Sequence, residues 1–495
     1  MLALAGAGLP GTVRAKTPDT LIFGLSSFPP NTSPFLNAGT AAGTVKVQLY
    51  RGLLGYDAQG NIREEVAETW TRESPTVHTF KLRANAKFHN GDAVTAEDVK
   101  YTFEQIMGER STAYLKSDFE RQLARVEVVD ARTVKLHLKA PSATFPFHLA
   151  SWHAPIISHK STAQAPIGCG PYTVASLERG TRIDLTRFDN FYRSGRPRTK
   201  TVRFIAYPDE NLRVAALEAG DVDLIEYVPW PNMEAISRNQ NLAMDNVDGP
   251  FMYLVFNVRQ GPFTNAKLRQ AVAYAINRED VVRAAFSGRG SVLEGIPIPI
   301  GSPFVNPELS RVWRRDLARA RALLGEGGQP NGFQATLLST AQYGMHKDTA
   351  EVVQQSLREI GVQATLNMPD WASRVTLGNR GQYDFAVMGS AGDFNDPDSL
   401  TAFLGGGTPS YVRSFGFENA RISQLLEQGR IELDPGKRRD IYTDLQRAAI
   451  DEAAMVGIAW RSQGYAMQRY VQGFKNLPAY LTFYSGVTIE DVVIA

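Results

Sequence analysis

The sequence predicts an α/β protein built from more than one domain. Its 495 residues exceed what one hydrophobic core serves, since single cores stop growing at about 250–300 residues. Twice a helical run ends at a glycine and is followed by an apolar run of strand length, in LRVAALEAGDVDLIEYV (212–228) and HKDTAEVVQQSLREIGVQATL (346–366). The order helix, glycine, strand is typical of α/β units.

Charge and cysteine content exclude several classes of protein. The chain has 53 Lys plus Arg against 51 Asp plus Glu, so its formal charge of +2 lacks the basic excess of a nucleic-acid binder. Its single cysteine, Cys169, cannot form an internal disulfide, and no Cys/His group has zinc spacing. We therefore expect no nucleic-acid partner and no cofactor.

The first residues resemble part of an export signal. Residues 1–15 are apolar and small and end in Val-Arg-Ala, like the core and cleavage end of a secretory signal that lacks its basic start. No later stretch of 18 apolar residues could span a bilayer as a helix. We expect a truncated signal segment at 1–15 and a periplasmic location.

The first predicted strand is LIFGL at 21–25. Pro29, Pro30 and Pro34 follow it and prevent a regular continuation, because proline fixes φ and lacks the N–H that a strand donates. A loop after a first strand is a common place for ligand contacts.

Two further stretches give clear elements. Residues 79–106 predict a strand, a turn at Asn90-Gly91 and a helix capped by Thr95 and Asp98. Residues 267–286 predict two helices, the second capped by Asn277. We expect Gly91 and Gly170 to adopt positive φ in turns.

Four segments, in order, resemble the family 5 extracellular solute-binding proteins that feed peptide, nickel and related ABC importers. They are LYRGLLGYDAQGNIREEVAETWTRESPTVHTFKLRANAKFHNGDAVTAEDVKYTF (49–103), IGCGPYTV (167–174), FMYLVFNVRQGPFTNAKLRQAVAYAINREDVV (251–282) and YDFAVMGSAGDFNDPDSL (383–400). Most signature residues in them are interpreted as architectural.

The resemblance implies a two-lobe periplasmic-binding-protein fold, class II and of the large type, with the ligand enclosed between the lobes. The implied boundaries are 16–45, 161–250 and 466–495 for the core of lobe I, 46–160 for an extra subdomain in lobe I, and 251–465 for lobe II. It implies a substrate-binding component of an ABC importer that captures a peptide or related small amine-bearing solute by hinge closure and delivers it to the membrane permease. We expect a monomer.

The resemblance also implies candidate ligand contacts. Asp393 matches the aspartate that holds a peptide's N-terminal ammonium, and Trp371 matches a tryptophan that lines side-chain pockets; a turn residue and a core ring are the alternatives. The backbone of Gly389, Ser390, Ala391 and Gly392 would bond to the ligand as an added strand.

Other candidates are less specific. His346, with Lys347 beside it, lies near where members can place a basic group for the ligand carboxylate; an exposed helix start is the alternative. The aromatic candidates, for which packing is the alternative, are Phe28, Tyr253 and Trp460. Oligopeptide-binding members have arginines where this chain has Gly378 and Val387, which argues against a long peptide and leaves Arg374 and Arg380 unmatched.

Other functions stay open at this point. The same fold could bind an opine, an oligosaccharide or a nickel chelate, although the seven histidines are scattered. It could also serve as a sensory or chaperone-like binding protein. An enzyme is disfavoured, because no Gly-x-Ser-x-Gly, His-Glu-x-x-His, Walker A or dinucleotide motif is present.

Overall fold

A computed structural model describes residues 19–37, 39–407 and 410–495, so the predicted signal segment at 1–15 lies outside the described residues. The molecule is organised around one sheet in the order β15-β14-β16-β12-β17-β11-β1-β10-β9-β8, with β13 paired to β17. Its strands are β1 (Thr20–Leu25), β8 (Tyr172–Glu178), β9 (Arg182–Arg187), β10 (Thr201–Ala206), β11 (Leu224–Ile225), β12 (Leu242–Phe256), β13 (Gly290–Val292), β14 (Gln334–Leu338), β15 (Gln363–Asn367), β16 (Phe385–Ser390) and β17 (Val456–Gln468).

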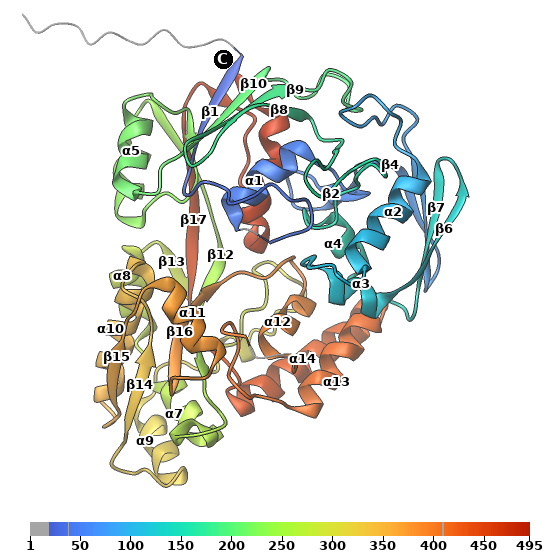
Figure 1. Cartoon of the computed structure of the whole chain (residues 1–495). Helices are drawn as coiled ribbons and strands as arrows, with labels where there is room; N and C mark the ends of the chain where they lie inside the picture. Colours follow the sequence, from blue (N-terminus) through green and yellow to red (C-terminus); the bar gives the residue numbers. More distant parts are fainter. Residues whose placement is uncertain (1–18, 38, 408–409) are drawn as a thin grey trace, which may run out of the picture.

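Two long strands join the two halves of the molecule. β12 and β17 are antiparallel and paired from Leu242 with Gln468 to Leu254 with Val456, and in Figure 1 they run between an upper and a lower body. We call the upper body, with β1 and β8–β11, lobe I and the lower body, with β13–β16, lobe II. The expected boundaries at 250/251 and 465/466 fall inside these two strands.

Helices cover both lobes. Those of lobe I are α1 (Thr40–Leu49), α5 (Glu210–Glu218) and α6 (Met233–Arg238). Those of lobe II are α7 (Ala266–Ala275), α8 (Arg278–Phe286), α9 (Leu317–Glu326), α10 (Gly344–Arg358), α11 (Trp371–Asn379), α12 (Thr401–Leu404), α13 (Ala420–Ile431) and α14 (Pro435–Glu452). Among the residues that the structure describes, no helix combines the length and apolar character of a membrane span.

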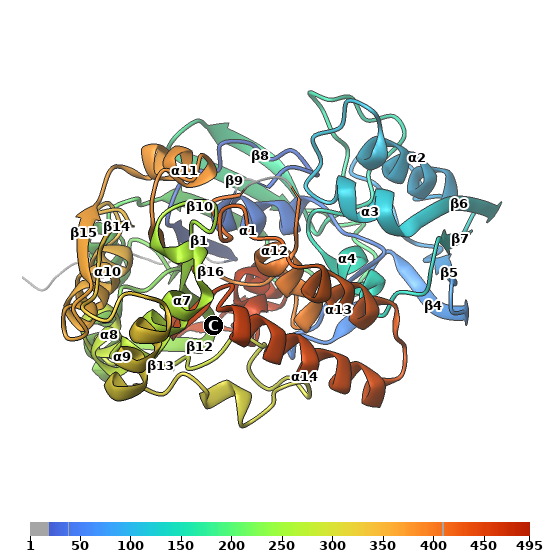
Figure 2. The ribbon, with the colours of Figure 1, turned by 90° about the horizontal axis from the view of Figure 1, so that it is seen from below.

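A subdomain stands beside lobe I and faces α13 of lobe II (Figure 2). Its four-stranded sheet has the order β4-β5-β7-β6, from β4 (Ala67–Ser74), β5 (Val77–Leu82), β6 (Leu123–Asp130) and β7 (Thr133–Leu138). The hairpin β2 (Leu54–Tyr56) and β3 (Ile62–Glu64) and the helices α2 (Ala96–Met107), α3 (Lys116–Gln122) and α4 (Phe145–Ala150) complete it.

Local sequence signals explain several of these elements. Thr95 and Asp98 form the predicted capping box at the start of α2, and the Asn277 side chain accepts a hydrogen bond from the Asp280 amide at the start of α8. α10 is followed by Gly361 at φ 84°, which reverses the chain into β15. The strand expected over 222–228 is shorter, because only Leu224–Ile225 pair in the sheet.

One glycine prediction was right and one was wrong. Gly91 has φ 91°, as the turn requires. Gly170 does not have positive φ; instead a Cβ there would lie 2.3 Å from the Gln48 carbonyl oxygen. Glycine at 170 is explained by close approach of two backbones rather than by turn geometry.

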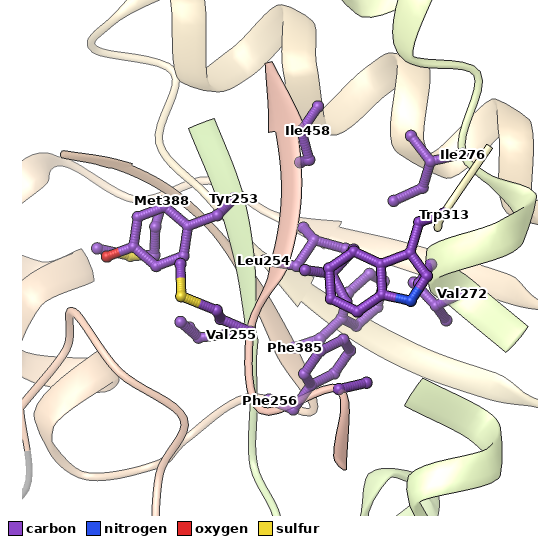
Figure 3. Close-up of a cluster of buried hydrophobic side chains, with 14 of the residues drawn as sticks. Tyr253, Leu254, Val255, Phe256, Val272, Ile276, Trp313, Phe385, Met388 and Ile458 are labelled. Carbon is purple, nitrogen blue, oxygen red and sulfur yellow. The ribbon is translucent and has the colours of Figure 1, made fainter. Parts of the chain in front are cut away.

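The core of lobe II forms around β12, because successive side chains of a strand point to opposite faces. Figure 3 shows Leu254 beside Trp313, and Tyr253 on the opposite side of β12 beside Met388. All four side chains are almost completely buried. The β12 strand is thus apolar on both faces where it enters lobe II.

The end of the chain returns to lobe I and is held there by a buried ionic cluster. Glu490 lies in the 3₁₀ segment Ala479–Asp491 and pairs with Arg51 at 2.9 Å and with Arg63 at 3.1 Å. Arg193 also pairs with Glu490, and with Glu65 at 2.9 Å. Although burial opposes its ionisation, the three arginines lower the pKa of Glu65 to about 2. The short pair β18 (Val471–Gln472) and β19 (Val493–Ile494) closes this segment.

Candidate ligand-binding site

The end of β16 lies at the contact between the lobes. Gly389 pairs with Met252 of β12, and a Cβ at Gly389 would be 2.9 Å from the Met252 sulfur and 3.3 Å from His346 Nε2. At Gly392 a Cβ would be 2.4 Å from the Tyr480 ring, which belongs to the returning segment. The stretch 389–392 thus runs between His346 of lobe II and Tyr480 with no room for larger side chains at its two glycines.

Asp393 follows this stretch and touches the lobe I subdomain. The Tyr114 hydroxyl donates to both carboxylate oxygens of Asp393, at 3.1 and 3.0 Å. Burial raises the pKa of Asp393 to about 6; the Tyr114 hydrogen bond opposes this shift and nearby Asp118 adds to it. In the part of the chain that the structure describes, no Lys, Arg or His pairs with this carboxylate. A cationic group of a ligand would supply the missing charge.

Neighbouring contacts join the lobes without a ligand. Phe394 stacks on Phe147 of α4 with ring centroids 5.2 Å apart. Thr144 donates to the Asp398 carboxylate at 2.8 Å, and the Ala143 amide donates to the Arg430 carbonyl at 2.8 Å. The structure is therefore a closed arrangement in which the loop 393–398 meets α4.

His346 and Trp371 lie together at the other end of the 389–393 stretch. Their ring centroids are 5.5 Å apart, and Trp371 is also 5.5 Å from the Tyr343 ring. Burial and the charges of Arg374 and Arg461 lower the pKa of His346 to about 3. His346 is thus a neutral imidazole at physiological pH, and any positive charge at this end comes from its neighbours.

Two arginines provide that charge. Arg374 of α11 is fully buried, donates to the Val387 carbonyl at 2.6 Å, and lies 5.2 Å from the Trp371 ring and 5.6 Å from the Tyr411 ring. Arg461 of β17 is 4% exposed and donates to the Met345 sulfur at 3.2 Å. His346 therefore lies near two cations, one from α11 and one from the crossing strand β17.

The three aromatic candidates lie in packed surroundings. Phe28 packs against the core of lobe I and lines a surface depression with Leu177 and Ile183, away from the lobe contact. Tyr253 is fully buried and donates to the Val412 carbonyl at 2.7 Å. Trp460 is 8% exposed, with its ring 5.7 Å from Phe251.

The structure brings some predicted residues together and adds others. His346, Trp371 and Gly389 form one end of the stretch and Asp393 the other, whereas Phe28 lies elsewhere. Sequence reasoning did not select Arg461, Arg374 or Tyr114 as contacts. Arg461 carried no comparable signal in the sequence, because the burial of the whole run VGIAWRSQGYAMQ is evident only in the structure.

Comparisons with known proteins agree with this architecture. The model of the bacterial extracellular solute-binding proteins, family 5, matches residues 61–411. The glutathione-binding protein GsiB of Pectobacterium atrosepticum is 27% identical over 454 residues, covering 88% of this chain and 87% of that protein.

Solved structures give the same result. AgaA of A. tumefaciens R10, a periplasmic binding protein in complex with agropinic acid, is 37% identical with a TM-score of 0.87, covering 96% of this chain and 99% of that chain. DppA from Helicobacter pylori, in complex with the peptide STSA, is 21% identical with a TM-score of 0.83, covering 96% and 98%. These structures confirm the predicted two-lobe fold.

Proposed function

This chain belongs to the bacterial extracellular solute-binding proteins, family 5, and from this premise we propose that it captures a short, amine-bearing solute in the periplasm and delivers it to its ABC permease. The ligand lies along 389–392 with its cationic group on Asp393. The protein works as a monomer that closes on the ligand and releases it unchanged.

The single observation that carries this proposal is the position of Asp393. Its carboxylate lies at the lobe contact, accepts hydrogen bonds from the Tyr114 hydroxyl of the opposite lobe and from no other side chain that the structure describes, and is desolvated enough for its pKa to be raised. A desolvated carboxylate is stabilised by a bound cation. A ligand on Asp393 would touch both lobes and favour closure.

The stretch beside Asp393 supports a short ligand. Residues 389 and 393 are four positions apart, so their Cα atoms are separated by at most about 14 Å. By the same rule an extended dipeptide spans about 7 Å and a tetrapeptide about 14 Å, so the stretch accommodates a peptide of at most about four residues. The backbone groups of 389–392 would give affinity without selecting side chains.

An acid related to agropinic acid is a second candidate. AgaA, which has been solved with agropinic acid, is 37% identical to this chain over almost its full length. GsiB, named as a glutathione-binding protein, is less similar, at 27%. We therefore place agropinic acid beside dipeptides and glutathione among the first ligands to test.

Thermal shift on protein that has been unfolded, dialysed and refolded would test the function. A ligand that binds only the folded state raises Tm, by an amount equivalent to about 2.7 kcal/mol at 100 times Kd. We expect dipeptides with a free N-terminus to raise Tm and their N-acetylated forms to have no effect.

The matched variants are Asp393→Asn and, as control, Asp189→Asn, whose side chain is 80% exposed. The first should lose the dipeptide response and the second should retain it. Equal responses to free and acetylated dipeptides, or an unchanged response in Asp393→Asn, would contradict the role of Asp393. A ligand recovered chemically altered would contradict a pure binding function.

A further inference from the structure

Most buried arginines of this protein have their charge or donors well satisfied. Arg430 and Arg438 form bidentate ion pairs with Asp398 and Asp396. Arg213 donates to three backbone carbonyls, and Arg278 donates to four, although Nη2 of Arg278 has no partner among the described residues. The chain therefore normally satisfies a guanidinium that it buries.

Arg461 and Arg374 do not follow this pattern. Within residues 19–37, 39–407 and 410–495, neither forms an ion pair with a carboxylate. Nε of Arg461 and both Nε and Nη1 of Arg374 have no hydrogen-bond partner in this part of the chain. The contact of Arg461 with the Met345 sulfur is weak, because a thioether is a poor acceptor.

Arg461 and Arg374 both lie close enough to His346 to affect its charge. Both lower the pKa of His346, and the ring of His346 touches Trp371 beside Arg374. Two residues along β17 from Arg461, the Gln463 side chain is also buried and its Oε1 has no partner. Residues two apart on a strand share a face, so these unsatisfied groups lie on one side of β17.

We propose that the ligand carries a carboxylate that binds the Arg461 guanidinium, so that the transported solute is an acid as well as an amine. Arg374, enclosed between the Trp371 and Tyr411 rings, is a positioning residue. It adds positive charge near the site without contacting the ligand. This inference rests on the proposed function, because it places the acid at the end of the 389–393 stretch opposite Asp393.

The physical reason is charge compensation. A guanidinium taken out of water needs an anion with matching acceptors, and a carboxylate offers two oxygens to its fork of N–H donors. Because nothing in the described part of the chain supplies that anion, the site is electrostatically complete only when the ligand brings it. Breaking such a buried pair weakens binding by about 30-fold or more.

Isothermal titration with two probes would test the proposal. The probes are agropinic acid and L-alanyl-L-glutamate, each compared with a derivative in which every carboxyl is a carboxamide. The wild-type protein should bind the acids about 30-fold or more tightly than the carboxamides. In Arg461→Met that difference should fall to about 3-fold or less, and Arg461→Lys should lie between them.

A second readout separates a ligand-binding role from a structural one. Without ligand, Arg461→Met should melt at the same temperature as the wild type or higher, because it removes a buried charge that lacks a partner. Arg238→Met, whose side chain is 78% exposed, is the matched control and should leave binding unchanged. A lower Tm together with weaker binding of acids and carboxamides alike would assign Arg461 to the fold and overturn the proposal.

The outcomes also distinguish this inference from the proposed function. Tight binding of dipeptide carboxamides that Asp393→Asn abolishes would overturn the acidic ligand and leave the role of Asp393 standing. Acid binding that depends on Arg461 but not on Asp393 would do the reverse. A Tm shift with 10 mM inorganic phosphate and none with either acid would replace the carboxylate by a phosphate and also overturn the proposal.

Discussion

Among single residues, Asp393 connects burial, charge and lobe contact most directly. Its carboxylate is bonded to Tyr114 across the lobe contact, and its pKa is about 6 because burial disfavours the charged form. The ordinary aspartate value is about 3.9. Ionisation of Asp393 in the unliganded protein is therefore a cost that a bound cation removes.

This cost predicts a pH-dependent effect of Asp393→Asn. A carboxyl whose pKa is raised by folding does not destabilise the fold below about pH 4, destabilises it increasingly from pH 4 to 6, and does so fully above pH 6. We expect unliganded Asp393→Asn to be more stable than the wild type by about 2 kcal/mol at pH 7.5. The two proteins should be equally stable near pH 4.

Urea unfolding of both proteins across this pH range would measure the difference. Asp189→Asn should show no such pH-dependent gain. A gain that is the same at pH 4 and pH 7.5 would mean that it does not come from the Asp393 charge.

At the scale of single residues, the sequence predicted which residues are candidates better than it predicted their charge and burial. The match of GSAGDFNDPD to a family motif was enough to select Asp393. It did not indicate that His346 is neutral, because that follows from burial and from two arginines 28 and 115 positions away in the chain. Arg461 was missed because burial of a side chain between two lobes is not encoded in its local pattern.

Among the elements, β12 shows how a glycine controls the crossing between lobes. The pairing of β12 with β17 shifts register between Asp248 and Phe251, a bulge in the crossing strand. Gly249 lies in this bulge, and a Cβ there would be 2.0 Å from the Ala479 carbonyl oxygen. The returning segment can pack on β12 only because residue 249 has no side chain.

Gly249→Ala should therefore destabilise the protein by about 1–3 kcal/mol, the usual cost of overpacking. Gly325→Ala is the matched control, because the residue is inside α9 and no described atom beyond its neighbours and the helix backbone lies within 4 Å of an added Cβ. A glycine inside a helix costs about 0.5–1 kcal/mol relative to alanine, so this control should be stabilised. Thermal unfolding of the two variants checks both signs, and equal stability of Gly249→Ala and wild type would contradict the packing argument.

Elements with strong local signals were predicted well. The helices that begin at Ala96 and Arg278 have caps that can be seen in the sequence, and both were found where expected. The strand expected at 222–228 pairs over only two residues, because pairing depends on β1 and β17 from distant parts of the chain. Local pattern specifies the type of an element, and its partners specify its length.

For the whole molecule, the balance between open and closed lobes is set in part by direct contacts. Phe394 of lobe II stacks on Phe147 of the lobe I subdomain, and Thr144 bonds to Asp398 beside them. These contacts favour closure before any ligand binds. Apparent affinity depends on the fraction of protein that is closed.

Phe394→Ala should shift the unliganded protein toward the open state. Loss of an aromatic pair worth about 0.5–1.5 kcal/mol would weaken apparent affinity by about 2- to 10-fold. Small-angle X-ray scattering of the unliganded variant should show a larger radius of gyration, which ligand at saturation restores. Leu212→Ala, which alters a 63% exposed side chain, is the control; equal radii for Phe394→Ala and wild type without ligand would show that this stack does not hold the lobes.

The buried cluster of Arg51, Arg63 and Arg193 with Glu65 and Glu490 has a consequence for how the protein is made. Three cations from the first 193 residues share two anions, and Glu490 follows Glu65 by 425 residues. The core of lobe I therefore cannot form completely until the segment that contains Glu490 has been synthesised. Cutting the chain before Glu490 would leave the buried Arg51 and the partly buried Arg63 and Arg193 with one carboxylate, so a truncation of a few residues should be as damaging to folding as the loss of a core element.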